Sequence, residues 1–483
     1  MRYKIYAENP QNHFLTVELE VENITSDRIK IQLPAWRPGR YELQNFAKNI
    51  QTFEIFDEQQ NPVEFHKVNK DRWKVYTKNI SKLTIRLRYY AYIQHPKGVF
   101  ANAGSSYVDE NTMYVNFVNC LPYVSGRMHE PCTVELGVAD EYKIACGMPI
   151  EGKTLLAQDY YQLVDSPILA SPYLQCQTYK AAGIQFYVWF LGNYQPNWEK
   201  ILSDFASFSE KQIDIMGDFP EKDYHFINWI LPVAFYHGVE HRNSTMIVLG
   251  PDTEGDGLYT DLLGVSSHEL YHAWNICKIR PVEMMPYDFT KENYFSTGFV
   301  AEGVTTYLGD VFLKQSGVFS LDAYLKEFTT TIRRHFEEDG LSSMSLVEAS
   351  FDLWLDGYVP SIPNRRVSIY NKGAVVAFLL DGLIREATQH EKSIHDVMRL
   401  MWENFGESGL GYSLNDYKKL AEDVFGGSLE TYFAECISGS IPLQEQVKTR
   451  LAWYGIEASF DENLRLTIGQ VDHDNENLRN WLG

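Results

Sequence analysis

The 483-residue sequence contains no apolar run near the roughly 18 residues that a helix needs to cross a membrane. Its longest apolar runs, such as Phe186–Leu191 and Ala374–Leu380, suit buried strands or helices. The N-terminus also lacks the apolar core of a secretory signal peptide. These absences predict a cytoplasmic protein that is not anchored in a membrane.

Basic residues are few, since 43 Lys and Arg stand against 64 Asp and Glu and give a formal net charge of -21. A field of this sign repels phosphate backbones and anionic lipid surfaces, so we expect neither nucleic acid nor membrane as a partner. The six cysteines form no CxxC pair. Their scatter is typical of free thiols in a reducing compartment.

What the chain does contain is the apolar and charged composition of a globular protein, at 45% and 22%. Residues 1–180 are predicted to form a β-sandwich-like domain, because segments such as Phe14–Val21, Ile29–Leu33 and Leu83–Tyr89 alternate between apolar and polar residues. Helical periodicity is scarce in this part of the chain.

A second domain is predicted over residues 181–450. Its strand-bearing lobe, about 181–261, combines the strands Ile184–Leu191 and Ile227–Leu231 with a helix over Asn197–Met216. Its helical lobe covers about 262–450, with helices expected over 262–277, 299–315, 321–338, 370–388, 393–404, 413–424, 429–438 and 443–453. Residues 451–483 are predicted to form a short C-terminal tail, either a small appendage or a loose end. The chain is therefore expected to be an α+β multidomain protein.

The strongest chemical signal is an H-E-x-x-H motif, His268-Glu269-Leu270-Tyr271-His272. Residues four apart lie on one face of a helix, so both imidazoles can reach one Zn²⁺ ion. Glu269 is placed to take a proton from a water at the metal. The alternative is a surface helix with two solvated histidines.

A third ligand is needed, because catalytic zinc sites usually have three protein ligands and a water. The longer pattern H-E-x-x-H-x-x-G-x-x-H fails, since Asn275 and Lys278 stand where Gly and His are required. We favour Glu302, which lies in an otherwise small and apolar helical stretch where a carboxylate needs a partner. Gly303 is expected to let this helix approach the metal helix closely. The alternatives are a solvated Glu302, or a ligand from Glu283, Glu292 or Asp310.

Two further segments carry candidate site residues. Glu240 lies between two strand-like runs, where an acidic residue beside a cleft could bind a free amine; the alternative is a hairpin turn with charged tips. Tyr370 stands at the start of a predicted helix, where it could donate a hydrogen bond to an oxyanion; the alternative is a core tyrosine.

Together these segments resemble the glycyl aminopeptidase family of zinc metallopeptidases, within the gluzincin group. The resemblance covers about residues 1–450 and rests on Pro34–Tyr41, Gly238–His241, Ser267–Pro281, Tyr287-Asp288, Ala301–Tyr307 and Tyr370–Arg385. It implies a thermolysin-like zinc peptidase domain with a mostly helical C-terminal lobe, behind the N-terminal β domain. Many members of the family continue into a PDZ domain, and about 30 residues after the last helical block are too few for one.

The resemblance also implies roles for individual residues. His268, His272 and Glu302 would bind one Zn²⁺ per chain, Glu269 would be the general base, and Tyr370 would steady the oxyanion. The family's substrates are peptides with a free N-terminus, preferably with Gly or Ala as the first residue.

The strand around Glu240 is similar to the family's substrate-anchoring strand, so Gly238, Val239 and Glu240 are expected to bind substrate, with Glu240 pairing with the α-ammonium group. Val239 departs from the pattern, because a further Gly is common at this point. An endopeptidase on the same scaffold and a catalytically silent peptide-binding protein are the alternatives.

Overall fold

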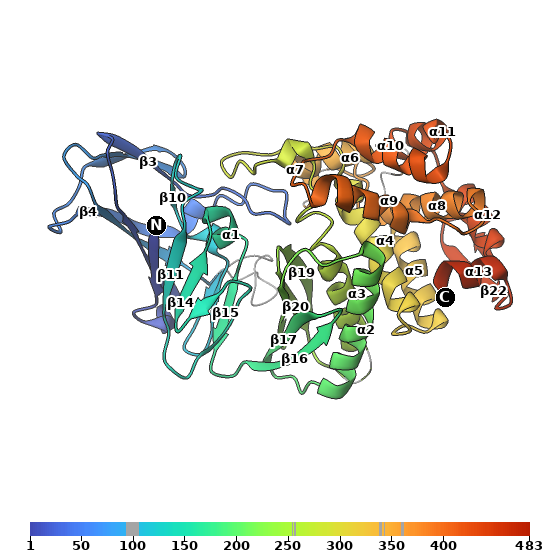
Figure 1. Cartoon of the computed structure of the whole chain (residues 1–483), viewed down its shortest axis with the longest axis horizontal. Helices are drawn as coiled ribbons and strands as arrows, with labels where there is room; N and C mark the ends of the chain where they lie inside the picture. The colour runs from blue at the N-terminus through green and yellow to red at the C-terminus, as the bar shows by residue number, and fades with distance from the viewer. Residues whose placement is uncertain (93–105, 254, 256, 338–340, 342, 359–361) are drawn as a thin grey trace.

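The computed structural model of the chain describes residues 1–92, 106–253, 255, 257–337, 341, 343–358 and 362–483. A β domain forms the N-terminal end of the molecule, and a second domain combines a mixed sheet with a group of helices (Figure 1). This arrangement confirms the predicted α+β multidomain fold. Within the described residues, no helix combines the length and the apolar character that crossing a membrane requires.

The N-terminal domain is built almost entirely of strands. These are β1 (Arg2–Tyr6), β2 (Phe14–Val21), β3 (Arg28–Gln32), β4 (Ile50–Asp57), β5 (Phe65–Asn69), β6 (Arg72–Tyr76), β7 (Leu83–Tyr90), β8 (Tyr107–Val108), β9 (Met113–Val115), β10 (Tyr123–Val124), β11 (Cys132–Gly137), β12 (Lys143–Ala145), β13 (Ile150–Glu151), β14 (Thr154–Ala157) and β15 (Ile168–Ser171), with the helix α1 (Tyr160–Val164).

The strands form a sandwich because their apolar residues alternate and need a second layer to cover them. One sheet has the order β13-β14-β11-β1-β2-β7-β4, and a second has the order β10-β3-β6-β5. Phe53 of β4 stacks on Trp73 of β6 with ring centroids 4.2 Å apart, which joins the two sheets. A third sheet, β12-β15-β9-β8, completes the domain. The predicted β-sandwich-like domain is confirmed.

The second domain begins with a five-stranded sheet in the order β16-β17-β18-β20-β19. Its elements are β16 (Gln175–Ala181), β17 (Ile184–Gly192), α2 (Trp198–Met216), β18 (Asp223–Ile230), β19 (Phe235–His241), β20 (Ser244–Gly250) and α3 (Gly257–Tyr271). β16 begins at Gln175 and pairs with β17, so this sheet starts a few residues before the predicted boundary at residue 181. β17, β18 and β20 run parallel, whereas β19 is an antiparallel edge strand beside α3.

The rest of the domain is helical. It contains α4 (Thr305–Gln315), α5 (Leu321–Phe336), α6 (Leu346–Phe351), α7 (Leu353–Asp356), α8 (Asn371–Ala387), α9 (Ile394–Met401), α10 (Leu414–Phe425), α11 (Glu430–Tyr432) and α12 (Gln444–Trp453), with π-helical turns at Phe299–Val304, Trp402–Gly406 and Phe433–Ile437. Each helix expected in this lobe from residue 299 onward is present. Residue 338, at the end of one expected helix, lies outside the described part of the chain.

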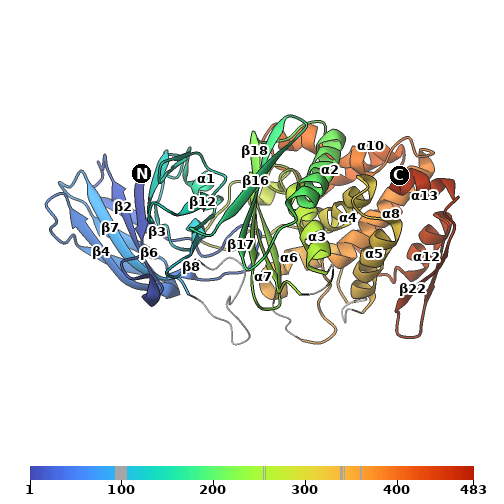
Figure 2. The same cartoon turned by 90° about the horizontal axis from the view of Figure 1, so that it is seen from below.

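The C-terminal residues fold back onto the helical lobe. The hairpin of β21 (Ile456–Phe460) and β22 (Leu466–Val471) is followed by α13 (Glu476–Leu482), at the end of the molecule opposite the N-terminus (Figure 2). Trp481 is fully buried, and its indole nitrogen donates a hydrogen bond to the Tyr307 hydroxyl at 2.7 Å. The segment is therefore a small packed appendage, and the loose tail considered from the sequence is wrong.

Candidate metal centre and active site

The H-E-x-x-H motif lies at the end of α3. This helix begins and ends earlier than the expected 262–277, so that His272 stands in the turn after Tyr271. Ser267, which follows the helix start by ten residues, is buried inside the helix and donates its hydroxyl to the backbone oxygen of Gly309 at 2.7 Å. Gln212 of α2 donates to the backbone oxygen of Ser267 at 2.9 Å. These bonds fix the motif helix between α2 and α4.

The side chains of His268, His272 and Glu302 converge at one point. The two Nε2 atoms are 2.9 Å apart, and Oε2 of Glu302 lies 3.3 Å from His272 Nε2 and 3.8 Å from His268 Nε2. Zinc–nitrogen bonds of roughly 2.0 Å in tetrahedral geometry place ligand atoms about 3.3 Å from one another. The three donors therefore fit a zinc ion.

The electrostatics of the group also suit a cation. Burial alone would raise the pKa of Glu302, but the two imidazoles lower it to about 2, so its carboxylate is ionised. Glu240, Glu269 and His272 form a second group whose donor atoms lie within 4.8 Å of one another. Two imidazoles with one carboxylate are a common catalytic zinc set, and the first group has that composition, whereas the second has two carboxylates and one imidazole.

Asn275 orients His272 and joins the motif helix to the Glu302 segment. Its backbone oxygen lies 2.5 Å from His272 Nδ1, which leaves Nε2 as the metal-binding atom. Its side-chain amide donates to the backbone oxygen of Val300 at 2.8 Å and to the Thr305 hydroxyl at 3.0 Å. The sequence showed that Asn275 breaks a longer zinc motif but not what it contributes.

Glu302 lies in the π-helical turn Phe299–Val304, a rare geometry that is frequent at functional sites. The expectation that Gly303 lets this turn approach the metal helix is wrong. A Cβ at Gly303 would lie 2.4 Å from the Cα of Gly373, so Gly303 permits contact with α8. Contact with α3 occurs at Gly309, where a Cβ would lie 3.3 Å from His268 Cα.

Among the described residues, the three rival ligands lie outside both donor groups. Glu283 and Glu292 belong to the segment between α3 and the π-helical turn, and Glu283 is exposed. Asp310 lines the cavity beside the site, and burial together with Glu327 raises its pKa to about 7.

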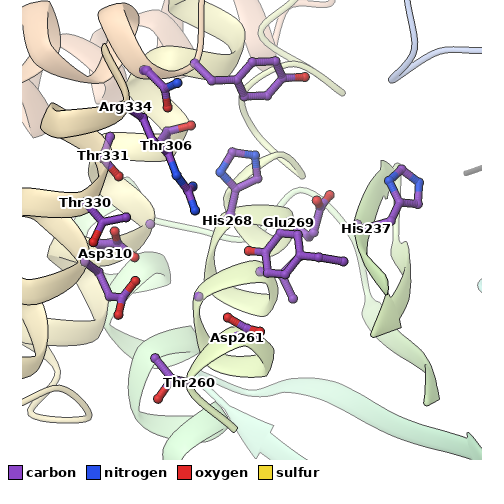
Figure 3. Close-up of a pocket in the computed structure, with 18 of the residues that line it drawn as sticks. His237, Thr260, Asp261, His268, Glu269, Thr306, Asp310, Thr330, Thr331 and Arg334 are labelled. Carbon is purple, nitrogen blue, oxygen red and sulfur yellow. The ribbon is translucent and has the colours of Figure 1, made fainter. Parts of the chain in front are cut away.

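A cavity of about 480 Å³ opens over the metal-binding group. Figure 3 shows His268 and Glu269 near the centre of the view, with Asp310 and Arg334 on one side, His237 of β19 on the other and Asp261 below them. Both the edge strand β19 and the motif helix α3 therefore line this cavity.

Glu269 is buried at 5% exposure, and its Oε2 atom has no hydrogen-bond partner among the described residues. Burial raises the pKa of Glu269 well above its usual range. The charge of His272 lowers this pKa, whereas the charges of Glu240 and Glu302 raise it further. Glu269 therefore lines the cavity with a carboxyl oxygen that is free to bind a water molecule. Such an oxygen can accept a hydrogen bond from the water and then take its proton.

The edge strand β19 brings Gly238, Val239 and Glu240 to this site. A Cβ at Gly238 would lie 2.2 Å from Oε1 of Glu269 and 2.6 Å from Cγ2 of Val265, so a larger residue here would displace the Glu269 carboxyl group. Glu240 is buried, and burial raises the pKa of its carboxyl group. Val239 is also buried, in a small apolar cluster.

Tyr370 stands at the start of α8 and lines the same cavity. Burial, followed by the charge of Glu302, raises its pKa well above the ordinary value, so its hydroxyl remains a hydrogen-bond donor. The structure thus brings the favoured candidates of four separate segments together at one site, apart from Val239, which belongs to the neighbouring apolar cluster.

Several cavity residues were not nominated from the sequence: Arg37, Arg40, His237, Asp261, Arg334 and Tyr358. Arg37 and Arg40 belong to Pro34–Tyr41, which the sequence marked as a β-domain motif without placing it at the site. Tyr358 belongs to a connection with no sequence pattern of its own.

An edge strand beside an H-E-x-x-H helix, with a glutamate from a later helical turn, defines a gluzincin-type zinc metallopeptidase. The Peptidase M61 N-terminal domain model matches residues 2–172, and the M61 glycyl aminopeptidase model matches residues 261–376. The two together match more than half of the chain, which belongs to the M61 glycyl aminopeptidase family. It is a zinc metallo-aminopeptidase, and thus a hydrolase.

Solved structures share the fold over almost the whole chain. An aminopeptidase N family protein from Idiomarina loihiensis has a TM-score of 0.89 at 25% identity, covering 98% of this chain and 81% of that one. The M1 zinc metallopeptidase from Deinococcus radiodurans has a TM-score of 0.52 at 13% identity, with coverage of 92% and 94%. A mutant of that enzyme bound to a Tyr-Ser-Ala substrate gives the same values. None of the curated proteins matches the chain in sequence.

Proposed function

We propose that the enzyme removes small N-terminal residues, Gly and Ala, from peptides with a free amino group, using one zinc ion held by His268, His272 and Glu302. The observation that carries this proposal is the position of Glu240. Its carboxylate is buried, and its oxygen lies within 4.8 Å of donor atoms of both Glu269 and His272. A fixed negative charge this close to the reacting centre selects a peptide whose first residue carries an ammonium group.

Zinc, when bound, polarises the substrate carbonyl and makes a water acidic enough to attack at neutral pH. Glu269 accepts the proton of the attacking water and delivers it to the leaving amine. Tyr370 donates its hydroxyl proton in a hydrogen bond to the carbonyl oxygen as negative charge develops there. Glu240 holds the α-ammonium group, so that only the first peptide bond reaches Glu269.

An N-acetylated peptide offers no ammonium group to Glu240 and leaves that carboxylate buried without its partner. Leaving a buried charge unpaired is costly, so we expect such peptides to be excluded. An endopeptidase on the same scaffold would cut them.

The test uses the full-length, zinc-loaded enzyme with glycyl- and alanyl-arylamides, N-acetyl-glycyl-arylamide and the variant Glu269→Gln. We expect turnover of the free-amine substrates only, with loss of activity in the variant. Cleavage of the acetylated compound would refute the proposal and indicate that the enzyme is an endopeptidase. No turnover of any substrate, with zinc bound, would favour a peptide-binding protein.

A further inference from the structure

One segment of the β domain is built into the second domain. Trp36 is fully buried, donates its indole N–H to the backbone oxygen of Asp288 at 2.8 Å, and packs edge-on against Trp354 with centroids 5.0 Å apart. The backbone N–H of Ala35 donates to the oxygen of Phe289 at 2.8 Å. The residues that follow, 37–40, are therefore held at a fixed position beside the active site.

Gly39 lies directly against the proposed ammonium anchor. A Cβ at this position would lie 2.7 Å from Oε2 of Glu240 and 2.9 Å from Cγ2 of Val239, and the residue has a φ of +77°. Both the contact and the backbone conformation call for glycine. The backbone of the β domain thus covers one side of the Glu240 carboxylate.

The next residue, Arg40, joins this segment to Tyr358 of the second domain. Its guanidinium carbon lies 4.5 Å from the centre of the Tyr358 ring, and its Nε donates to Glu42 at 2.8 Å. The Tyr358 hydroxyl accepts a hydrogen bond from the backbone N–H of Tyr41 at 3.3 Å. Gly39, Arg40 and Tyr358 all line the cavity that contains Glu269.

The position of a substrate's first side chain follows from its ammonium group. A hydrogen bond to Glu240 and one N–Cα bond place the substrate's Cα about 4 Å from the carboxylate. Gly39 lies so close to that carboxylate that even a Cβ on it would come within 2.7 Å of Oε2. A side chain longer than a methyl group must then share the space beside Glu240 with residues 37–40 and with the Tyr358 ring, which packs against Arg40.

We propose that Gly39 and the Arg40–Tyr358 contact form the wall of the pocket for the first side chain, so that the β domain sets the preference for Gly and Ala. This inference rests on the proposed function, because it takes Glu240 as the anchor. Arg40 and Tyr358 exclude larger residues by occupying the space that those residues would need.

The test measures kcat/KM for glycyl-, alanyl-, leucyl- and phenylalanyl-arylamides with the full-length, zinc-loaded enzyme and the variants Tyr358→Ala, Tyr358→Phe and Arg40→Ala. For Tyr358→Ala we expect the leucyl-to-glycyl ratio to rise at least tenfold. Tyr358→Phe retains the ring and should keep the parental ratio, whereas Arg40→Ala should raise it. Tyr173→Ala is the matched control, since Tyr173 is an exposed β-domain tyrosine outside the residues that line the cavity.

The inference would be overturned if Tyr358→Ala and Arg40→Ala slowed all four substrates equally and left the leucyl-to-glycyl ratio of kcat/KM unchanged. The Arg40–Tyr358 contact would then have a structural role only. If Tyr358→Ala does not fold, Arg40→Ala decides the question alone. An enzyme that cleaves no free-amine substrate in its parental form would instead refute the proposed function, and the inference with it.

Discussion

The backbone oxygen of Asn275 lies 2.5 Å from Nδ1 of His272, just beyond the end of the motif helix. The side chain of the same residue bonds to Val300 and Thr305, on the segment that carries Glu302. One residue therefore contacts both the imidazole of His272 and the segment that carries Glu302, two of the three proposed metal ligands.

Removing the Asn275 side chain should weaken metal binding. Asn275→Ala keeps the backbone oxygen that faces His272 but removes the amide that bonds to Val300 and Thr305, on the segment that carries Glu302. We expect the zinc affinity to fall by roughly 10–100-fold, because partners that position metal ligands typically contribute that much. Competition with a chromogenic chelator measures the affinity. Asn404→Ala, at an exposed asparagine after α9, is the matched control and should bind zinc like the parent. Equal affinities in the two variants would contradict this role for Asn275.

The contact between Gly303 and Gly373 leads to a second prediction. Alanine at position 303 would bring its Cβ to 2.4 Å from backbone of α8, and neither backbone can move without shifting Glu302. We expect Gly303→Ala to lower the free energy of unfolding by roughly 1–3 kcal/mol, as overpacking does, and to weaken zinc binding. Urea unfolding and the chelator assay measure the two effects.

Gly264→Ala provides the comparison for this variant. Gly264 lies within α3, and a Cβ there would meet nothing within 4 Å. Alanine should therefore stabilise the helix by up to about 1 kcal/mol. Similar free energies of unfolding for Gly303→Ala and Gly264→Ala would show that Gly303 and Gly373 are not closely packed.

Asp310 should make stability depend on pH. Its pKa is raised to about 7 in the folded protein, above the value of an unfolded chain, so the native state binds the extra proton between about pH 4 and 7. Its contribution to stability is then present at low pH and is lost as pH rises through 7. Asp310→Asn, which cannot ionise, should be more stable than the parent at pH 8 by roughly 1–3 kcal/mol, and close to it at pH 5.

Urea unfolding of parent and variant at the two pH values tests this difference. Asp252→Asn, at an exposed position, should follow the parent at both. A pH-independent difference between Asp310→Asn and the parent would mean that Asp310 is ionised throughout this range.

The sequence predicted the parts of this enzyme that depend on local pattern. Alternation identified β2 and β7, and helical periodicity identified α2 and α5. These succeed because burial of one face imposes a period of two on a strand and of about 3.6 on a helix.

The remaining features depend on packing between distant segments. Gly303 carries no local sign that its neighbour is Gly373, because the two are 70 residues apart. Trp481 lies in a polar, acidic segment, and its burial follows from packing against distant residues such as Tyr307 and Tyr454. Tyr358 reaches the active site through a contact with Arg40 of another domain. No periodicity in one segment encodes such pairings.

Replacement of Glu240 separates substrate anchoring from metal chemistry. Glu240→Ala removes the buried charge that pairs with the ammonium group, and loss of such a partner typically costs about 2–5 kcal/mol. We expect kcat/KM for glycyl-arylamide to fall at least 30-fold, while zinc affinity stays at the parental value because His268, His272 and Glu302 remain. Steady-state kinetics and the chelator assay provide the two readouts. A variant that keeps the parental preference for free-amine over acetylated substrates would show that another group binds the ammonium.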